Sequence, residues 1–78
     1  MTSSVTSAVR ATSVKVGRTH LEVSLNDGRA VRVPIAWFPR LAAATAEQRK
    51  RWRLIGRGVG IRWEELDEDL SVEGLLRA

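Results

Sequence analysis

Alternating apolar and polar residues predict an antiparallel hairpin in the first half of the chain. The apolar residues of 20–25 (HLEVSL) share one face, as in a half-buried strand. Gly28 follows and can adopt the positive φ that a tight hairpin loop requires. Residues 29–35 (RAVRVPI) return as a second strand, in which Pro34 marks a sheet edge or a strand end. A short strand over residues 14–16 is expected to precede the hairpin.

The middle of the chain is predicted to be helical. Pro39 suits the first helical position, where no backbone N–H is needed, and predicts a short turn of helix over residues 39–44. Thr45 and Gln48 match a capping box, in which two side chains satisfy the free N–H groups at a helix start. A second helix is therefore expected from residue 46 to about residue 53.

The last third of the chain predicts one more strand and a final helix. Apolar residues alternate from 59 to 63, after a glycine-rich turn. Ser71 is a good N-cap for a short helix that carries Val72, Leu75 and Leu76. The predicted fold class is α+β: a small antiparallel sheet of three to four strands with two or three short helices packed on one side.

Length and composition restrict the organisation of the chain. A chain of 78 residues is expected to form one small domain. Residues 1–12 are rich in Ser and Thr and are interpreted as a flexible N-terminal tail, which leaves residues 13–78 as a single α+β domain. The sequence contains no cysteine, which excludes disulfides, thiolate chemistry and the common zinc sites.

The apolar pattern also bears on localisation. No apolar run approaches the roughly 18 residues needed to cross a membrane. The first dozen residues lack a charged start followed by an apolar stretch, so they are not interpreted as a secretion signal. We therefore expect a cytoplasmic protein that does not associate with membranes.

Charge is strongly divided along the chain. Residues 29–62 carry a formal charge of +8 and residues 63–78 carry −5, within a net charge of +4. Such asymmetry indicates either a nucleic-acid site or two segments that neutralise each other. The basic segment at residues 49–57 supplies the candidate contacts to a partner protein or to nucleic acid, which are Arg49, Lys50, Arg53 and Arg57, with Arg51 beside them.

The acidic segment, residues 64–73, is the main candidate for metal chemistry. An EF-hand loop that began at Asp67 would need glycine at its sixth position and glutamate at its twelfth, where Val72 and Ala78 stand instead. A magnesium site at Asp67 and Asp69, acting on a phosphorylated substrate, is a third and weaker hypothesis. We expect no metal and no cofactor.

The preferred interpretation of this segment is structural. Its apolar residues close the core while its acids face the arginines and precede a helix, where negative charge is favoured. We name these apolar residues the clasp: Trp63, Leu66, Leu70, Val72 and Leu75.

Other candidates for chemistry are weak. His20 is the only histidine and lies on the polar face of a predicted strand, and no nucleophile-elbow motif accompanies it. No catalytic residue is assigned. Trp37, Trp52 and Trp63 are expected in the core rather than on a stacking platform for nucleic acid, because so small a core needs large side chains.

Several motifs occur together in a fixed order. The chain carries DGR at 27–29, VPI at 33–35, WFPRL at 37–41, EQR at 47–49, GIRW at 60–63 and LDEDLSVEGLL at 66–76. In order and spacing they resemble the compact members of domain-of-unknown-function family 2442 over about residues 14–77. One departure is Glu64, where the family commonly places proline.

The resemblance implies a small bacterial α+β domain with no assigned activity and no catalytic residue to carry over. Members of the family are often paired with a second small protein in arrangements that look like toxin–antitoxin modules. The leading hypothesis is a non-enzymatic, antitoxin-like, protein-binding module. Its expected partner is a small cognate toxin-like protein, or a second copy of the chain. The alternative is a nucleic-acid-binding protein that uses the basic segment.

Overall fold

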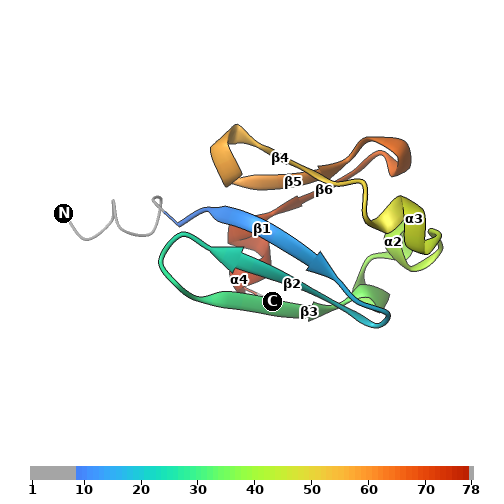
Figure 1. Cartoon of the computed structure of the whole chain (residues 1–78), viewed down its shortest axis with the longest axis horizontal. Helices are drawn as coiled ribbons and strands as arrows, with labels where there is room; N and C mark the ends of the chain where they lie inside the picture. Colours follow the sequence, from blue (N-terminus) through green and yellow to red (C-terminus); the bar gives the residue numbers. More distant parts are fainter. Residues whose placement is uncertain (1–8, 78) are drawn as a thin grey trace.

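The computed structural model describes residues 9–77, which form two three-stranded antiparallel sheets (Figure 1). Sheet A has the order β1-β2-β3 and consists of β1 (Ala11–Val16), β2 (His20–Leu25) and β3 (Ala30–Pro34). Sheet B has the order β4-β5-β6 and consists of β4 (Arg53–Ile55), β5 (Gly60–Trp63) and β6 (Glu68–Ser71). A 3-10 turn (Ile35–Trp37), α2 (Pro39–Ala42) and α3 (Ala46–Arg49) connect the sheets, and α4 (Val72–Arg77) follows sheet B.

The predicted hairpin is confirmed as β2 and β3. The register pairs Leu21 with Val33, so that the apolar residues of both strands face the same side. The hairpin loop is closed where the backbone N–H of Leu25 donates to the carbonyl oxygen of Arg29 at 2.8 Å. Gly28 has φ of 93° in this loop, as its position in the sequence indicated.

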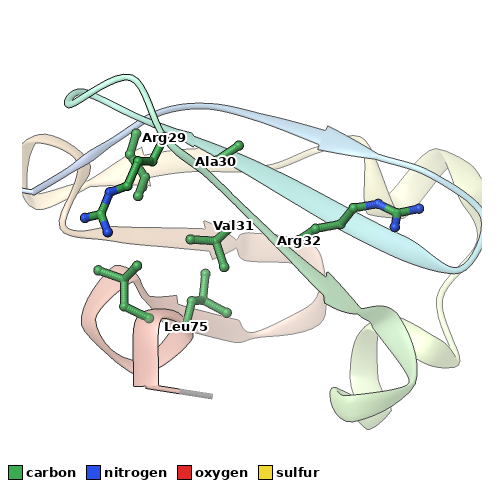
Figure 2. A pocket seen from close by; sticks show the side chains of 7 residues that line it. Arg29, Ala30, Val31, Arg32 and Leu75 are labelled. Atoms are coloured by element: carbon green, nitrogen blue, oxygen red, sulfur yellow. The ribbon is translucent and has the colours of Figure 1, made fainter.

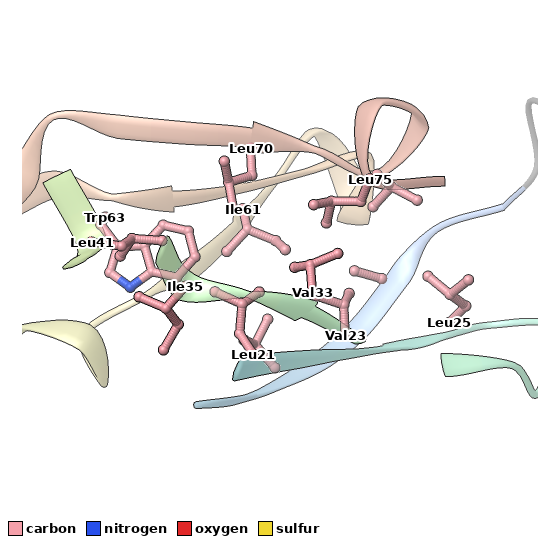
Figure 3. Packing of buried hydrophobic residues seen from close by; sticks show 13 residues of the cluster. Leu21, Val23, Leu25, Val33, Ile35, Leu41, Ile61, Trp63, Leu70 and Leu75 are labelled. Carbon is pink, nitrogen blue, oxygen red and sulfur yellow. The ribbon is translucent and has the colours of Figure 1, made fainter. Parts of the chain in front are cut away.

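The core lies between the two sheets (Figure 3). Leu21 and Val23 of sheet A face Ile61 and Leu70 of sheet B, and Leu75 of α4 closes one side. The most deeply buried side chains in the described chain are Trp63, Leu21, Leu41, Ile61 and Val23. Each fully buried aliphatic side chain contributes about 1.5–3 kcal/mol, so these few side chains supply much of the folding free energy.

The α+β class and the antiparallel pairing are confirmed, and the arrangement adds a second sheet. The helix expected to reach residue 53 ends at Arg49, and β4 begins four residues later. A further strand, β6, uses part of the acidic segment. α2 and α3 lie at one end of the sheets, while α4 packs beside β3 and β6 (Figure 1). Strands of three or four residues carry too short an alternation to be predicted, and pairing with β5 decides their conformation.

The start of the domain differs slightly from the expectation. β1 begins at Ala11, so Ala11 and Thr12, which were assigned to the tail, belong to sheet A. Residues 1–8 of the predicted tail lie outside the described residues. No helix in residues 9–77 is long and apolar enough to span a membrane.

A close backbone contact joins the two sheets at the turn between β4 and β5. Gly58 has φ of 97°, and a Cβ atom at this position would lie 2.5 Å from the carbonyl oxygen of Ala11 in β1. Gly58 therefore serves two purposes: it adopts the left-handed conformation, and it lets the turn approach β1.

We expect Gly58→Ala to destabilise the domain far more than Gly28→Ala. Both glycines have similar positive φ, 97° and 93°, but nothing lies within 4 Å of a Cβ at Gly28. Gly28→Ala should cost only the conformational term of about 1–2 kcal/mol. Gly58→Ala adds a steric clash and should cost roughly 1–3 kcal/mol more. Urea unfolding of both variants measures the difference, and equal losses would contradict the backbone contact.

Candidate functional site

The side chain of Arg49 is used within the fold. Its Nε donates to the carbonyl oxygen of Leu41 at 2.8 Å, and one terminal nitrogen donates to that of Ala42 at 3.0 Å. A longer bond of 3.4 Å reaches the carbonyl oxygen of Arg18. These carbonyls lie at the end of α2 and in the β1–β2 turn, so the guanidinium caps a helix and ties it to sheet A. Arg49 is therefore unsuited to the partner contact that the sequence suggested.

The other bases of the segment do not form one surface. Arg53 contacts Glu64, and Arg51 contacts Glu65 at 3.1 Å. Lys50 and Arg57 are exposed and form no ion pair with another described residue. Lys50 follows α3 and Arg57 lies in the β4–β5 turn, at opposite ends of sheet B (Figure 1). The structure thus separates the candidate contacts that stand close together in the sequence.

Arg62, in β5, is the centre of the ion pairs that the acidic segment forms. Its guanidinium lies 3.2 Å from the Glu64 carboxylate, 2.8 Å from that of Asp67 and 2.8 Å from that of Asp69. Arg40, from α2, also contacts Asp67. The Arg62 side chain is only 22% exposed, which makes it the least exposed of these charged groups.

The ion-pair network shifts the protonation of its acids. Hydrogen bonding from Arg62 lowers the pKa of Asp67 below its ordinary value. Hydrogen bonds from Arg53, and then from Arg62, lower the pKa of Glu64. The hydrogen bonds to Asp69, and then to Asp67 and Glu64, raise the pKa of the Arg62 guanidinium. The expected neutralisation of the acidic segment by arginines is therefore realised in the fold, with Arg62 as its main agent.

The network bears on the metal hypothesis. Asp67 and Asp69 are brought together as that hypothesis required, but the Arg62 guanidinium lies between them and contacts both. Within residues 9–77, no group of three or more His, Cys, Asp or Glu side chains is placed to hold a metal ion. His20 lies apart from these acids, and its Nδ1 is 2.9 Å from the Thr19 hydroxyl oxygen.

The clasp residues lie in the core or against it, which is the position expected from the sequence. Trp63, Leu70, Val72 and Leu75 are buried, and Leu66 is half-buried against the core. The indole N–H of Trp63 donates to the carbonyl oxygen of Arg49 at 2.9 Å, which links sheet B to α3.

The expected burial of the tryptophans is wrong for Trp37, whose side chain is 54% exposed. Residues 31, 33 and 35 face inward in alternation, and the pattern would continue to residue 37. The 3-10 turn at Ile35–Trp37 ends the alternation and changes the direction of the side chain. Trp52 is half-buried against the core.

A groove between β3 and α4 was not predicted (Figure 2). It has a volume of about 300 Å³. Its lining residues are Leu25, Arg29, Ala30, Val31, Arg32, Leu75 and Leu76. Leu76, on the α4 side of the groove, is 38% exposed. The sequence held two signals: Leu76 extends the clasp onto the surface, and Pro34 marks β3 as an edge strand.

The two meanders, the helical connection and the groove define a class: a small α+β domain of two three-stranded antiparallel sheets, with a groove beside the edge strand β3. Residues 11–78 match the family model described as "Protein of unknown function (DUF2442)". The chain belongs to this family, as the motifs indicated. No curated protein matches the chain.

Two solved structures are similar to this chain. A crystal structure of a protein of unknown function from Rhodospirillum rubrum ATCC 11170 is 31% identical, with a TM-score of 0.79 over 88% of this chain and 86% of that one. A solution NMR structure of the uncharacterized protein CV0863 from Chromobacterium violaceum is 26% identical, with a TM-score of 0.75 over 87% of this chain and 64% of that one. Both support the fold, and neither description names a ligand or an activity.

We expect Arg49→Ala to destabilise the domain by about 1–3 kcal/mol, because charged hydrogen bonds to backbone carbonyls are lost together with side-chain packing. Lys50→Ala, next to it in the chain and exposed, should change the free energy of unfolding by less than about 0.5 kcal/mol. Chemical denaturation of the two variants makes the comparison. If both substitutions change the free energy of unfolding equally little, Arg49 is a free surface cation and its structural role is contradicted.

We expect Arg62→Gln to reduce the dependence of stability on acid pH. The pKa values of Asp67 and Glu64 are lower in the folded state than their ordinary values of 3.8 and 4.5. Their contribution is therefore complete above the ordinary values and is lost as the pH falls through the folded ones. The difference in unfolding free energy between wild type and Arg62→Gln should be largest at neutral pH and should shrink as the acids are protonated.

The control for this experiment is Arg77→Gln, which removes an exposed pair with Glu73 on α4. Exposed pairs of this kind contribute little, so its stability should follow the wild-type pH profile. Urea unfolding in a series of buffers from neutral to acid pH records all three proteins. If the unfolding free energy of Arg62→Gln depends on pH in the same way as that of wild type, the coupling of these acids to Arg62 is contradicted.

Proposed function

We propose that this chain is a non-enzymatic protein-binding module that acts in the cytoplasm and neutralises a partner protein, in the manner of an antitoxin. The observation that carries the proposal is the groove between β3 and α4, which combines apolar walls with an open strand edge. Surfaces of this composition are typical of protein-binding sites, where a partly exposed apolar centre is surrounded by polar groups.

The apolar walls explain why a partner would bind. Leu76 is 38% exposed on α4, and Val31, half-buried on β3, lines the same groove. A partner that covers Leu76 removes apolar surface from water, at roughly 25 cal/mol for each Å². Trp37 and Val59 are more exposed, at 54% and 47%, but of these three apolar residues only Leu76 lines the groove.

The charges of the basic segment support protein binding over the nucleic-acid alternative. Arg49 binds backbone carbonyls, and Arg51 and Arg53 contact acids of the same chain. Lys50 and Arg57 remain, at opposite ends of sheet B. Two phosphate contacts would give a log–log salt slope of only about −2, which is typical of weak, non-specific binding.

The proposal is tested by affinity capture from a bacterium that encodes this chain. Wild type is compared with Leu76→Glu, which places a charge in the groove, and with Lys50→Glu, which changes an exposed charge elsewhere. We expect one protein to be recovered in a fixed ratio with wild type and with Lys50→Glu, and to be lost with Leu76→Glu. Nuclease treatment should leave the recovery unchanged.

The antitoxin-like part is tested by expressing the captured partner alone. We expect the partner to slow growth and the wild-type chain, but not Leu76→Glu, to restore it. Recovery of nuclease-sensitive nucleic acid in place of a protein, abolished by charge reversal at Lys50 and Arg57, would establish the alternative function. A captured partner that is harmless alone would leave a binding module without a neutralising role.

A further inference from the structure

We propose that the groove receives an acidic, extended segment of the partner, which pairs with β3 and adds a fourth strand to sheet A. This inference rests on the proposed function, because it describes the partner of the same groove. It follows from three features of the described residues: the direction of the backbone groups of β3, the shape of the groove and the position of two arginines.

The register shows which backbone groups of β3 face outward. The N–H of Leu25 donates to the carbonyl oxygen of Arg29, and the N–H of Ile35 donates to that of Thr19, both at 2.8 Å. In an antiparallel ladder, hydrogen-bonded pairs alternate with pairs whose N–H and C=O groups point away from each other. Ala30 and Arg32 occupy these alternate positions, so their backbone groups point away from β2.

These outward groups are open to a partner. In residues 9–77, no loop or side chain accepts from the N–H of Ala30 or Arg32. β3 is an edge strand of sheet A, whereas β1, at the other edge, lies near β4. An edge with unpaired N–H and C=O groups is a template for another strand, and partner peptides commonly bind in this way.

The groove runs along this edge (Figure 2). Four consecutive residues of the chain, 29–32, line it on one side, and Leu75 and Leu76 of α4 line it on the other. A segment that pairs with β3 would place alternate side chains toward α4. Apolar side chains suit those positions, because Val31, Leu75 and Leu76 surround them.

An arginine on the far face of β3 determines the charge of the occupant. Arg29 and Arg32 both border the groove and are exposed, but their side chains project to opposite faces: Arg29 lies on the side of α4, whereas Arg32 points away from Leu75, on the face where Glu22 is its partner in register (Figure 2). Arg29 also contacts Asp27 at 2.8 Å, on the hairpin loop, and Arg32 forms no ion pair with another described residue. In a segment whose apolar residues face α4, the residues between them project to the face of Arg32. Opposite charges across neighbouring strands stabilise a sheet, so this site favours carboxylates at those positions.

The same arginines argue against a second copy of this chain as the occupant. A symmetric antiparallel pair of β3 strands would bring Arg29 and Arg32 of both copies into one seam. Like charges opposite each other are destabilising, and charged residues on edge strands prevent self-pairing in many proteins. The acids of residues 64–69 cannot serve as the segment while Arg53 and Arg62 hold them in their own sheet.

The inference is tested first with a probe, a peptide of about eight residues that alternates glutamate and valine. Amide hydrogen exchange of the free protein should show fast exchange at Ala30 and Arg32 and protection at Val31 and Val33. Saturating peptide should slow exchange at Ala30 and Arg32 by about tenfold or more, as expected for amides that enter a ladder. A peptide that alternates lysine and valine should have no such effect.

Matched variants separate backbone pairing from charge. Ala30→Pro removes one outward N–H without breaking the ladder to β2, and Pro34 already occupies the equivalent outward position in the same strand. It should weaken peptide binding about fivefold to tenfold, which corresponds to one lost hydrogen bond. Arg32→Glu should weaken binding of the acidic peptide, whereas Arg57→Glu should not. Melting curves confirm that each variant is folded.

The outcomes distinguish this inference from the proposed function. A captured partner that still binds Ala30→Pro and Arg32→Glu as tightly as wild type would refute strand addition and leave a protein-binding module. Protection of Ala30 and Arg32 by the acidic peptide, with no protein captured from the host, would leave the strand site and refute the proposed function. Protection of these amides in the free protein, rising with its concentration, would assign the edge to a second copy.

Discussion

The contact between Trp63 and the backbone of Arg49 is the interaction on which the rest of the structure depends. The indole ring is fully buried between the sheets, and its N–H donates to the carbonyl oxygen of Arg49. The side chain of the same arginine donates to carbonyl oxygens of Leu41 and Ala42 at the end of α2. One residue thus links sheet B, α3 and α2, and it does so through groups that would otherwise be unsatisfied next to the core.

This arrangement explains how so short a chain forms two sheets. Each three-stranded meander covers the core face of the other, so the two sheets share one hydrophobic core. The close approach of Gly58 to β1 brings the sheets together at one end, and the Trp63 contact does so near the helices. α4 then closes the side of the core and, in doing so, forms one wall of the groove beside β3.

The charges of the chain are organised by the same packing. The acidic segment follows β5, returns as β6 and places its acids around Arg62, so that much of the positive charge of the preceding segment is compensated locally. The groove lies apart from this network. Arg29, Arg32 and several apolar side chains line it. A partner therefore meets a small basic and apolar surface, rather than the broad basic face that a count of charges along the chain suggests.

The sequence by itself determined the features that depend on near neighbours. The β2–β3 hairpin follows from alternation and Gly28, and the capping box of Thr45 and Gln48 forms as its spacing predicts. The Ser71 hydroxyl accepts from the backbone N–H of Gly74 at the start of α4. These features involve residues a few positions apart, and their geometry is fixed by backbone periods and local hydrogen bonds.

Only the tertiary structure decided the roles that depend on distant partners. β4 and β6 are strands because β5 lies between them, Arg49 turns inward because the end of α2 offers carbonyls, and Trp37 is exposed because a turn interrupts its alternation. The groove likewise requires β3 and α4, which are separated by about half of the chain. A local pattern cannot specify such contacts, because the same residues are compatible with several partners until packing of the core selects one.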